Sequence, residues 1–219
     1  MKQITLAALL FLAACSGNQP AQQTSTDSAK TAESVVPAIN AKNIWVDNLN
    51  KKKYPLPDSI NHKPVSFYLD NPNVAPLAKA FYHGQFRPGN DDSTAQLLSY
   101  VTTSDNIVRP FYAWCLDFTI LINSGGYGTY TESPALNYAL KFPKEFFDFI
   151  DEDPSGDRDR RWTEMIAYDE LTTYSTKEEE IAKDITTKMN HNCHACSSSI
   201  KNRIAKFAED ISNIAKLQD

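Results

Sequence analysis

One segment, Arg109 to Ile122, would be apolar on every side of a helix, and it constrains the fold more than any other part of the chain. It reads RPFYAWCLDFTILI and is the most apolar run after the N-terminal leader. Pro110 suits a first helical turn, while Gly125 and Gly126 supply a stop. A helix that is apolar all round is a buried helix, and this segment is too short to cross a bilayer, which takes about 20 residues. The segment therefore predicts the central helix of a globular core.

Apolar residues recur at helical spacing along most of the remaining chain, which predicts amphipathic helices around this core. The content of 7 glycines against 12 prolines argues against a sandwich or barrel with many tight turns. We therefore expect an all-α fold, either an irregular helical bundle or a short α-solenoid of about 7–8 helices around the buried central helix. The expected helices start near Asn73, Asp92, Ser133, Pro143 and Arg160.

A continuous apolar seam runs from Ile181 to Ile214 near the C-terminus. Its members recur every three or four residues, which predicts either one long helix or two helices joined near Ser197 to Ser199, where serines weaken helix propensity. Because both the seam and the central helix are strongly apolar, we expect them to pack against each other.

The first 15 residues, MKQITLAALLFLAAC, form a leader with a basic Lys2, an apolar span and then Leu12-Ala13-Ala14-Cys15. This pattern resembles the signal sequence of bacterial lipoproteins. The resemblance covers the leader only, and it implies that residues 1–14 are removed and that Cys15 is lipidated. The alternative is an ordinary signal peptide or short anchor that contains a chance cysteine.

Residues 15–34 are expected to form a disordered tether, because after Cys15 they include no aromatic or branched aliphatic residue up to Glu33. We expect residues 35–219 to be a single all-helical domain, whose first helix would run from Ser34 to Leu49, followed by a loop up to Pro64. Ser16 after the cysteine resembles the outer-membrane sorting pattern of lipoproteins. The resemblance therefore implies an outer-membrane protein of the bacterial envelope that faces the periplasm.

The charge and the motifs narrow the classes of function. The chain has 22 basic and 27 acidic residues, a net charge of −5, without a basic stripe, so nucleic acid is a poor partner. It has no HExxH, GxSxG or P-loop motif. The sequence therefore favours a non-catalytic helical domain that binds another protein or acts as a scaffold, held at the membrane through Cys15. A specific alternative is an immunity protein that neutralises a toxin delivered to the periplasm.

The segment from Asp151 to Asp159 is acidic and resembles the first half of an EF-hand loop, with Gly156 at the sharp-turn position. Trp162 stands where that family has a closing glutamate, which puts calcium binding in question. The alternative is that the aspartates cap the following helix and that nearby arginines neutralise them. No cofactor is expected for this chain, and calcium at this loop is the alternative. The candidate calcium ligands are Asp151, Asp153, Ser155, Asp157 and Asp159.

The sharpest chemical candidate is the segment His191 to Cys196, which reads HNCHAC. In an oxidising envelope, the three cysteines other than Cys15 permit one disulfide and leave one thiol. Two pairings are open: Cys115 with either cysteine of the segment, which would tie the central helix to the C-terminal seam, or a local Cys193–Cys196 bond.

Two further readings of this segment remain open. The side chains of His191, Cys193, His194 and Cys196 are all of the types that bind zinc. The Cys-x-x-Cys spacing is also that of thiol–disulfide exchange sites. Covalent haem attachment is excluded, because it requires histidine directly after the second cysteine and Ser197 stands there.

Overall fold

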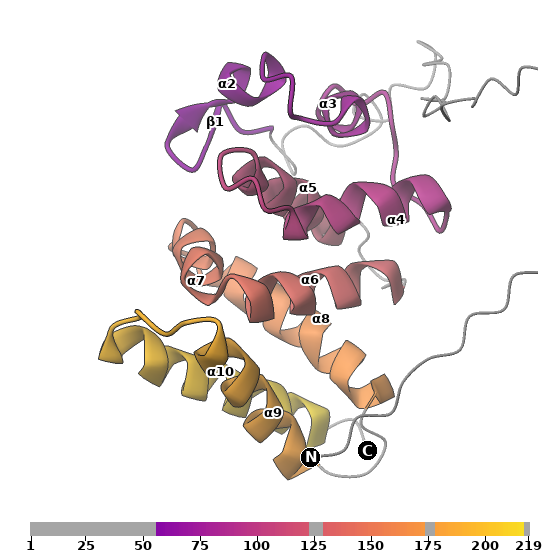
Figure 1. Ribbon diagram of the computed structural model, residues 1–219. Helices are drawn as coiled ribbons and strands as arrows, with labels where there is room; N and C mark the ends of the chain where they lie inside the picture. The colour runs from indigo at the N-terminus through magenta and orange to yellow at the C-terminus, as the bar shows by residue number, and fades with distance from the viewer. Residues whose placement is uncertain (1–55, 123–128, 174–177, 217–219) are drawn as a thin grey trace, which may run out of the picture. The chain divides into compact units, whose positions relative to one another are not determined.

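The computed structural model describes residues 56–122, 129–173 and 178–216, drawn as coloured ribbons in Figure 1. Within these ranges the chain forms nine α-helices, one 3-10 helix and a two-stranded hairpin, which confirms the predicted all-helical fold. The elements are β1 (Ser59–Ile60), β2 (Lys63–Pro64), α2 (Val65–Leu69), α3 (Pro76–Tyr82), α4 (Asp92–Ser99), the 3-10 helix η1 (Tyr100–Thr102), α5 (Arg109–Ile122), α6 (Thr129–Lys141), α7 (Pro143–Asp151), α8 (Asp157–Thr173), α9 (Glu178–His191) and α10 (Ser198–Lys216).

The leader, Cys15, the tether and the expected helix from Ser34 to Leu49 lie outside the described residues, as do Gly125 and Gly126. These predictions stay predictions.

Helix α5 begins and ends where the sequence predicts, and every residue from Arg109 to Ile120 is buried. Its main neighbours are α3, α4, η1, α6, α8 and the first strand. Aromatic rings dominate these contacts: Trp114 stacks on Phe118 with ring centroids 5.2 Å apart, and Phe81 of α3 lies against both. Burying one such side chain contributes about 1.5–3 kcal/mol. Because α5 buries several of them and contacts all the surrounding elements, it forms the centre of the N-terminal half of the core.

The apolar seam near the C-terminus forms two helices rather than one, and its break lies at residues 192–197. Helices α9 and α10 pack against each other through the seam, while α10 also contacts α8 and α9 contacts α6. Helices α6 and α8 thus stand between α5 and the C-terminal pair (Figure 1). This corrects the expectation that the central helix packs directly against the seam, because two intervening helices bury the facing surfaces of both.

Two local features differ from the sequence-based expectation. Residues expected to be loop form the β1–β2 hairpin, whose two-residue turn has positive φ at Asn61 (47°) and His62 (59°). Such turns usually carry glycine at the second position. Because His62 stands there, the sequence gives only a weak indication of a hairpin. Helix α6 begins at Thr129 rather than at Ser133, and Pro134 lies inside it.

Candidate functional site: the disulfide loop between two helices

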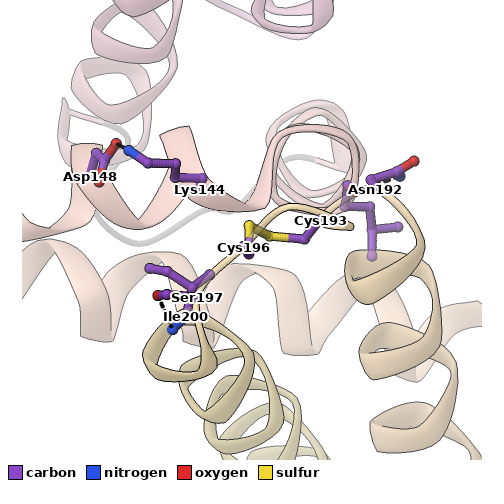
Figure 2. The surroundings of a disulfide bond; sticks show 8 residues. Lys144, Asp148, Asn192, Cys193, Cys196, Ser197 and Ile200 are labelled. Carbon is purple, nitrogen blue, oxygen red and sulfur yellow. Dashed lines mark hydrogen bonds and ion pairs between the residues drawn. A yellow bond between two sulfur atoms is a disulfide. The ribbon is translucent and has the colours of Figure 1, made fainter.

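A disulfide bond between Cys193 and Cys196 closes the loop that joins α9 to α10 (Figure 2). The two Cα atoms are 5.2 Å apart, within the range that a disulfide bridges. Cys115 in α5 carries a free thiol and is fully buried. Of the two pairings that the sequence leaves open, the structure has the local one. The alternative tie from the central helix to the seam is absent, because α6 and α8 separate the two.

The two cysteines of the disulfide differ in exposure. Cys193 is 3% exposed and belongs to the hydrophobic core. Cys196 is only partly buried and packs at the edge of that core. The bond therefore joins a buried cysteine to a partly exposed one, an asymmetry that the spacing of the cysteines does not reveal.

Cys196 lies at the start of a long helix. The next residue, Ser197, caps α10: its Oγ accepts a hydrogen bond from the Ile200 amide at 3.4 Å, and its carbonyl accepts one from the Lys201 amide at 3.1 Å. Helix α10 has 19 residues and no acidic residue in its first turn. The partial positive charge at a helix N-terminus favours anions there. A thiolate at Cys196 would experience this field without a neighbouring carboxylate in the first turn.

The loop is also held by hydrogen bonds that involve no sulfur atom. The Asn192 side-chain amide donates to the Leu140 carbonyl of α6 at 2.8 Å. The Cys196 amide donates to the Cys193 carbonyl at 3.1 Å, and the Cys193 amide donates to the Asn190 carbonyl at 3.2 Å. The loop conformation therefore does not depend on the disulfide alone.

A surface cavity of about 380 Å³ adjoins this loop. It lies where η1, α6 and α9 end, and Lys141 at its wall donates a hydrogen bond to the Thr102 carbonyl at 2.8 Å. Asn192 belongs to the lining and directly precedes Cys193, so the cavity opens beside the disulfide-bearing loop. The lining residues are Thr102, Asn137, Leu140, Lys141, Lys188 and Asn192.

The two histidines of the loop are exposed, and their ring centroids lie 5.2 Å apart. Within the described ranges, no three residues among histidine, cysteine, aspartate and glutamate gather in a way that would hold a metal ion. While the disulfide is closed, Cys193 and Cys196 carry no thiolate to offer as a ligand. Zinc binding by His191, Cys193, His194 and Cys196 stays a prediction for the reduced protein.

The acidic loop connects α7, which ends at Asp151, to α8, which begins at Asp157. Asp151 pairs with Arg203 of α10, and Asp157 lies 3.7 Å from Arg160 in the first turn of its own helix. Gly156 has φ +77°, a left-handed conformation that suits a glycine turn. Each of these aspartates thus has a cationic partner on the protein, and calcium binding by the loop stays a prediction.

Asp153 is the residue that organises the acidic loop. Its carboxylate accepts hydrogen bonds from the Ser155 hydroxyl at 2.6 Å and from the Arg158 amide at 2.8 Å, and also from the Ser155 amide. Partial burial pushes the Asp153 pKa upward, but these hydrogen bonds outweigh burial and the pKa is lowered. Asp153 therefore caps the start of α8, which is the alternative to calcium binding that the sequence predicts for this loop.

A buried ionic cluster, which the sequence analysis missed, joins α5 to α8. Asp117 is 7% exposed and accepts hydrogen bonds from the Trp162 indole at 2.9 Å, from Arg158 at 3.2 Å and from Arg161 at 3.3 Å. Arg158 also lies over the Phe149 ring and contacts Glu152. The sequence predicts that the arginines neutralise the acidic loop, whereas the side chains of Arg158 and Arg161 reach Asp117. The available signal was the single aspartate within an otherwise apolar helix.

A second charged pair links α5 to α7. Arg109 binds Glu145 in a bidentate manner, at 2.8 and 2.7 Å, and also donates to the Thr103 carbonyl. The Tyr138 hydroxyl donates to the same carboxylate at 3.2 Å. Burial, reinforced by Glu145, raises the pKa of Tyr138 well above its usual value. Both charged clusters therefore orient helices within the core, and neither combines a nucleophile with a base.

No protein-family model, curated protein sequence or solved structure matches this chain. Among the described helices, none is both long and apolar enough to cross a membrane. The described part of the chain is an all-helical bundle in which a disulfide closes the loop between the last two helices.

Proposed function

We propose that the chain is a lipoprotein of the bacterial envelope, acylated at Cys15, whose helical domain binds another protein. The observation that carries the proposal is the leader, in which a basic residue and an apolar span precede Leu12-Ala13-Ala14-Cys15. The disulfide between α9 and α10 supports it independently, because disulfides form and persist in oxidising compartments such as the periplasm.

Metabolic labelling with an alkyne fatty acid tests the lipid anchor. We expect the wild-type chain to take up the label and to partition into the detergent phase, and the Cys15→Ser variant to lose both properties. The matched control is Cys115→Ser, which changes a buried cysteine 100 positions after Cys15 in the sequence (115 − 15) and retains the label. An unlabelled wild-type chain, or a labelled Cys15→Ser variant, would contradict acylation at Cys15. Separation of inner and outer membranes then tests the outer-membrane location.

For the protein-binding part, the acidic loop between α7 and α8 offers a surface. Asp151 and Asp157 are exposed even though each pairs with an arginine of the protein, and exposed carboxylates are the chemistry that a basic protein partner, such as a toxin, recognises. This supports the immunity-protein version of the proposal.

The test is a pull-down with the product of an adjacent toxin gene, using the Asp157→Lys variant. We expect binding to fall by about tenfold or more on charge reversal. The control is Glu209→Lys, which reverses an exposed charge on α10 and leaves binding intact. Equal binding by both variants and the wild type would exclude the loop as the contact surface.

A further inference from the structure

The disulfide between α9 and α10 is not the only contact that holds these two helices together. Helices α9 and α10 already pack through a buried apolar seam that includes Ile185, Met189, Ile204 and Phe207. Three hydrogen bonds without sulfur atoms hold the loop between them. Opening the bond therefore leaves the helix pair and the loop with their other contacts.

The reduced state also has suitable places for both sulfur atoms. Cys193 lies in the core, where a thiol behaves as a small apolar group, and Cys115 shows that this fold accommodates a buried thiol. Cys196 lies partly exposed just before the capped N-terminus of α10, where the helix field favours a thiolate. The pair thus consists of a partly exposed cysteine and a buried one, which suits a site where one sulfur reacts first and the other follows.

We propose that Cys193 and Cys196 form a reversible thiol–disulfide exchange site, with Cys196 as the sulfur that partner thiols attack. The partner thiolate bonds to Sγ of Cys196, the Cys193–Cys196 bond breaks, and its electron pair stays on the Cys193 sulfur, which takes up a proton. A second partner thiol then attacks the mixed disulfide and releases Cys196. The site gains two electrons and two protons, and the partner's two thiols become a disulfide.

The first experiment measures whether the bond exchanges in the folded protein. The purified full chain is equilibrated with reduced and oxidised glutathione, to which structural disulfides are resistant, and is then quenched in acid for intact mass measurement. We expect partial reduction of the Cys193–Cys196 bond with unchanged helical circular dichroism. Buried Cys115 is an internal control, because native alkylation should leave it unlabelled. A bond that stays oxidised, or that opens only when Cys115 becomes labelled, would overturn the proposal.

The second experiment identifies the attacked sulfur. Cys193→Ser leaves Cys196 as the one thiol of the pair, and Cys196→Ser leaves Cys193. Each variant is mixed with oxidised glutathione, and peptide mapping locates the mixed disulfide apart from Cys15 and Cys115. We expect Cys196 to react at least about tenfold faster than Cys193. Equal rates, or a faster Cys193, would contradict the assigned roles, while the wild-type experiment remains decisive if either variant fails to fold. Neither result bears on acylation at Cys15.

Discussion

Two helix junctions in this protein are stabilised by different chemistry. Helices α5 and α8 meet around Asp117, a buried carboxylate that receives hydrogen bonds from three residues 41 to 45 positions away in the sequence. Helices α9 and α10 meet along an aliphatic seam, and a disulfide between residues only three positions apart closes their loop. The first junction contains a buried charge that three side chains share, whereas the second consists of many apolar contacts and a local bond. A single substitution should therefore harm the two junctions to very different degrees.

The largest effect is expected when Asp117 is replaced by Ala. Removing this carboxylate leaves Arg158 and Arg161 partly buried without their main anion, and an uncompensated buried charge costs about 3–5 kcal/mol. The free energy of unfolding, measured in urea, should fall by that amount. Asp157→Ala is the matched control, since it removes an exposed aspartate at the start of the same helix. A loss below about 1 kcal/mol for Asp117→Ala would show that the buried cluster does not hold the junction.

Removing the disulfide should have a smaller effect. Because the bond closes a loop of about four residues, the chain-entropy estimate of its contribution is roughly 2 kcal/mol. The double variant Cys193→Ala/Cys196→Ala should unfold at a correspondingly lower urea concentration. Adding reductant to the wild type should produce a similar loss, and adding it to the double variant should change nothing. A global loss of helix on reduction would mean that the seam cannot hold α9 and α10 without the bond.

Replacing Asp153 by Ala should cost about 1 kcal/mol at neutral pH, the usual value of a capping side chain. Folding lowers the Asp153 pKa, so its contribution is present above the usual value of 3.8 and disappears as the pH falls through the lower folded-state pKa. The difference between variant and wild type should therefore shrink in acid. In contrast, partial desolvation of the exposed Asp159 side chain raises its pKa, so the contribution of Asp159 is present below 3.8 and disappears as the pH rises through the higher folded-state pKa. Urea unfolding of both alanine variants across this range tests the two opposite trends.

The smallest effect is expected at the exposed pair of Lys144 and Asp148, which lie four residues apart on α7 near the disulfide loop (Figure 2). Solvent screens such a pair, so Lys144→Ala should cost only about 0.3–0.5 kcal/mol. The loss should diminish in high salt. A loss as large as that of Asp117→Ala would show that burial is not what separates the two kinds of charged contact.

The sequence predicts the helices whose apolar pattern is long and regular. The bounds of α5 and the start of α7 agree with the prediction, because proline and an apolar run mark them clearly. The seam near the C-terminus was correctly assigned as helical, with two helices among the alternatives. The hairpin before α2 was missed, because Asn61 and His62 adopt positive φ without a glycine, and α2 itself is too short to show a helical period.

The candidate site was predictable only in part. The spacing of Cys193 and Cys196 identified the residues, and the local bond was one of two pairings that the sequence left open. The sequence could not show that Cys193 is buried and Cys196 partly exposed, because that depends on which side of the loop faces α6 and the core. The contact of Arg158 with Asp117, in addition to Glu152 of the acidic loop, was also not predictable, because it forms across the interface between α8 and α5.

By itself, the sequence determined the helical class, the buried position of Arg109 to Ile122 and the residues of the disulfide loop, because these follow from local periodicity and local spacing. Only the tertiary structure decided that α6 and α8 separate the central helix from the C-terminal pair. Because of this separation, Cys115 keeps a free thiol and Cys193 forms its disulfide with Cys196. The physical reason is that partner choice depends on distances between elements far apart in the chain. Those distances are set by the packing of the whole core, so they cannot be derived from any local stretch of the sequence.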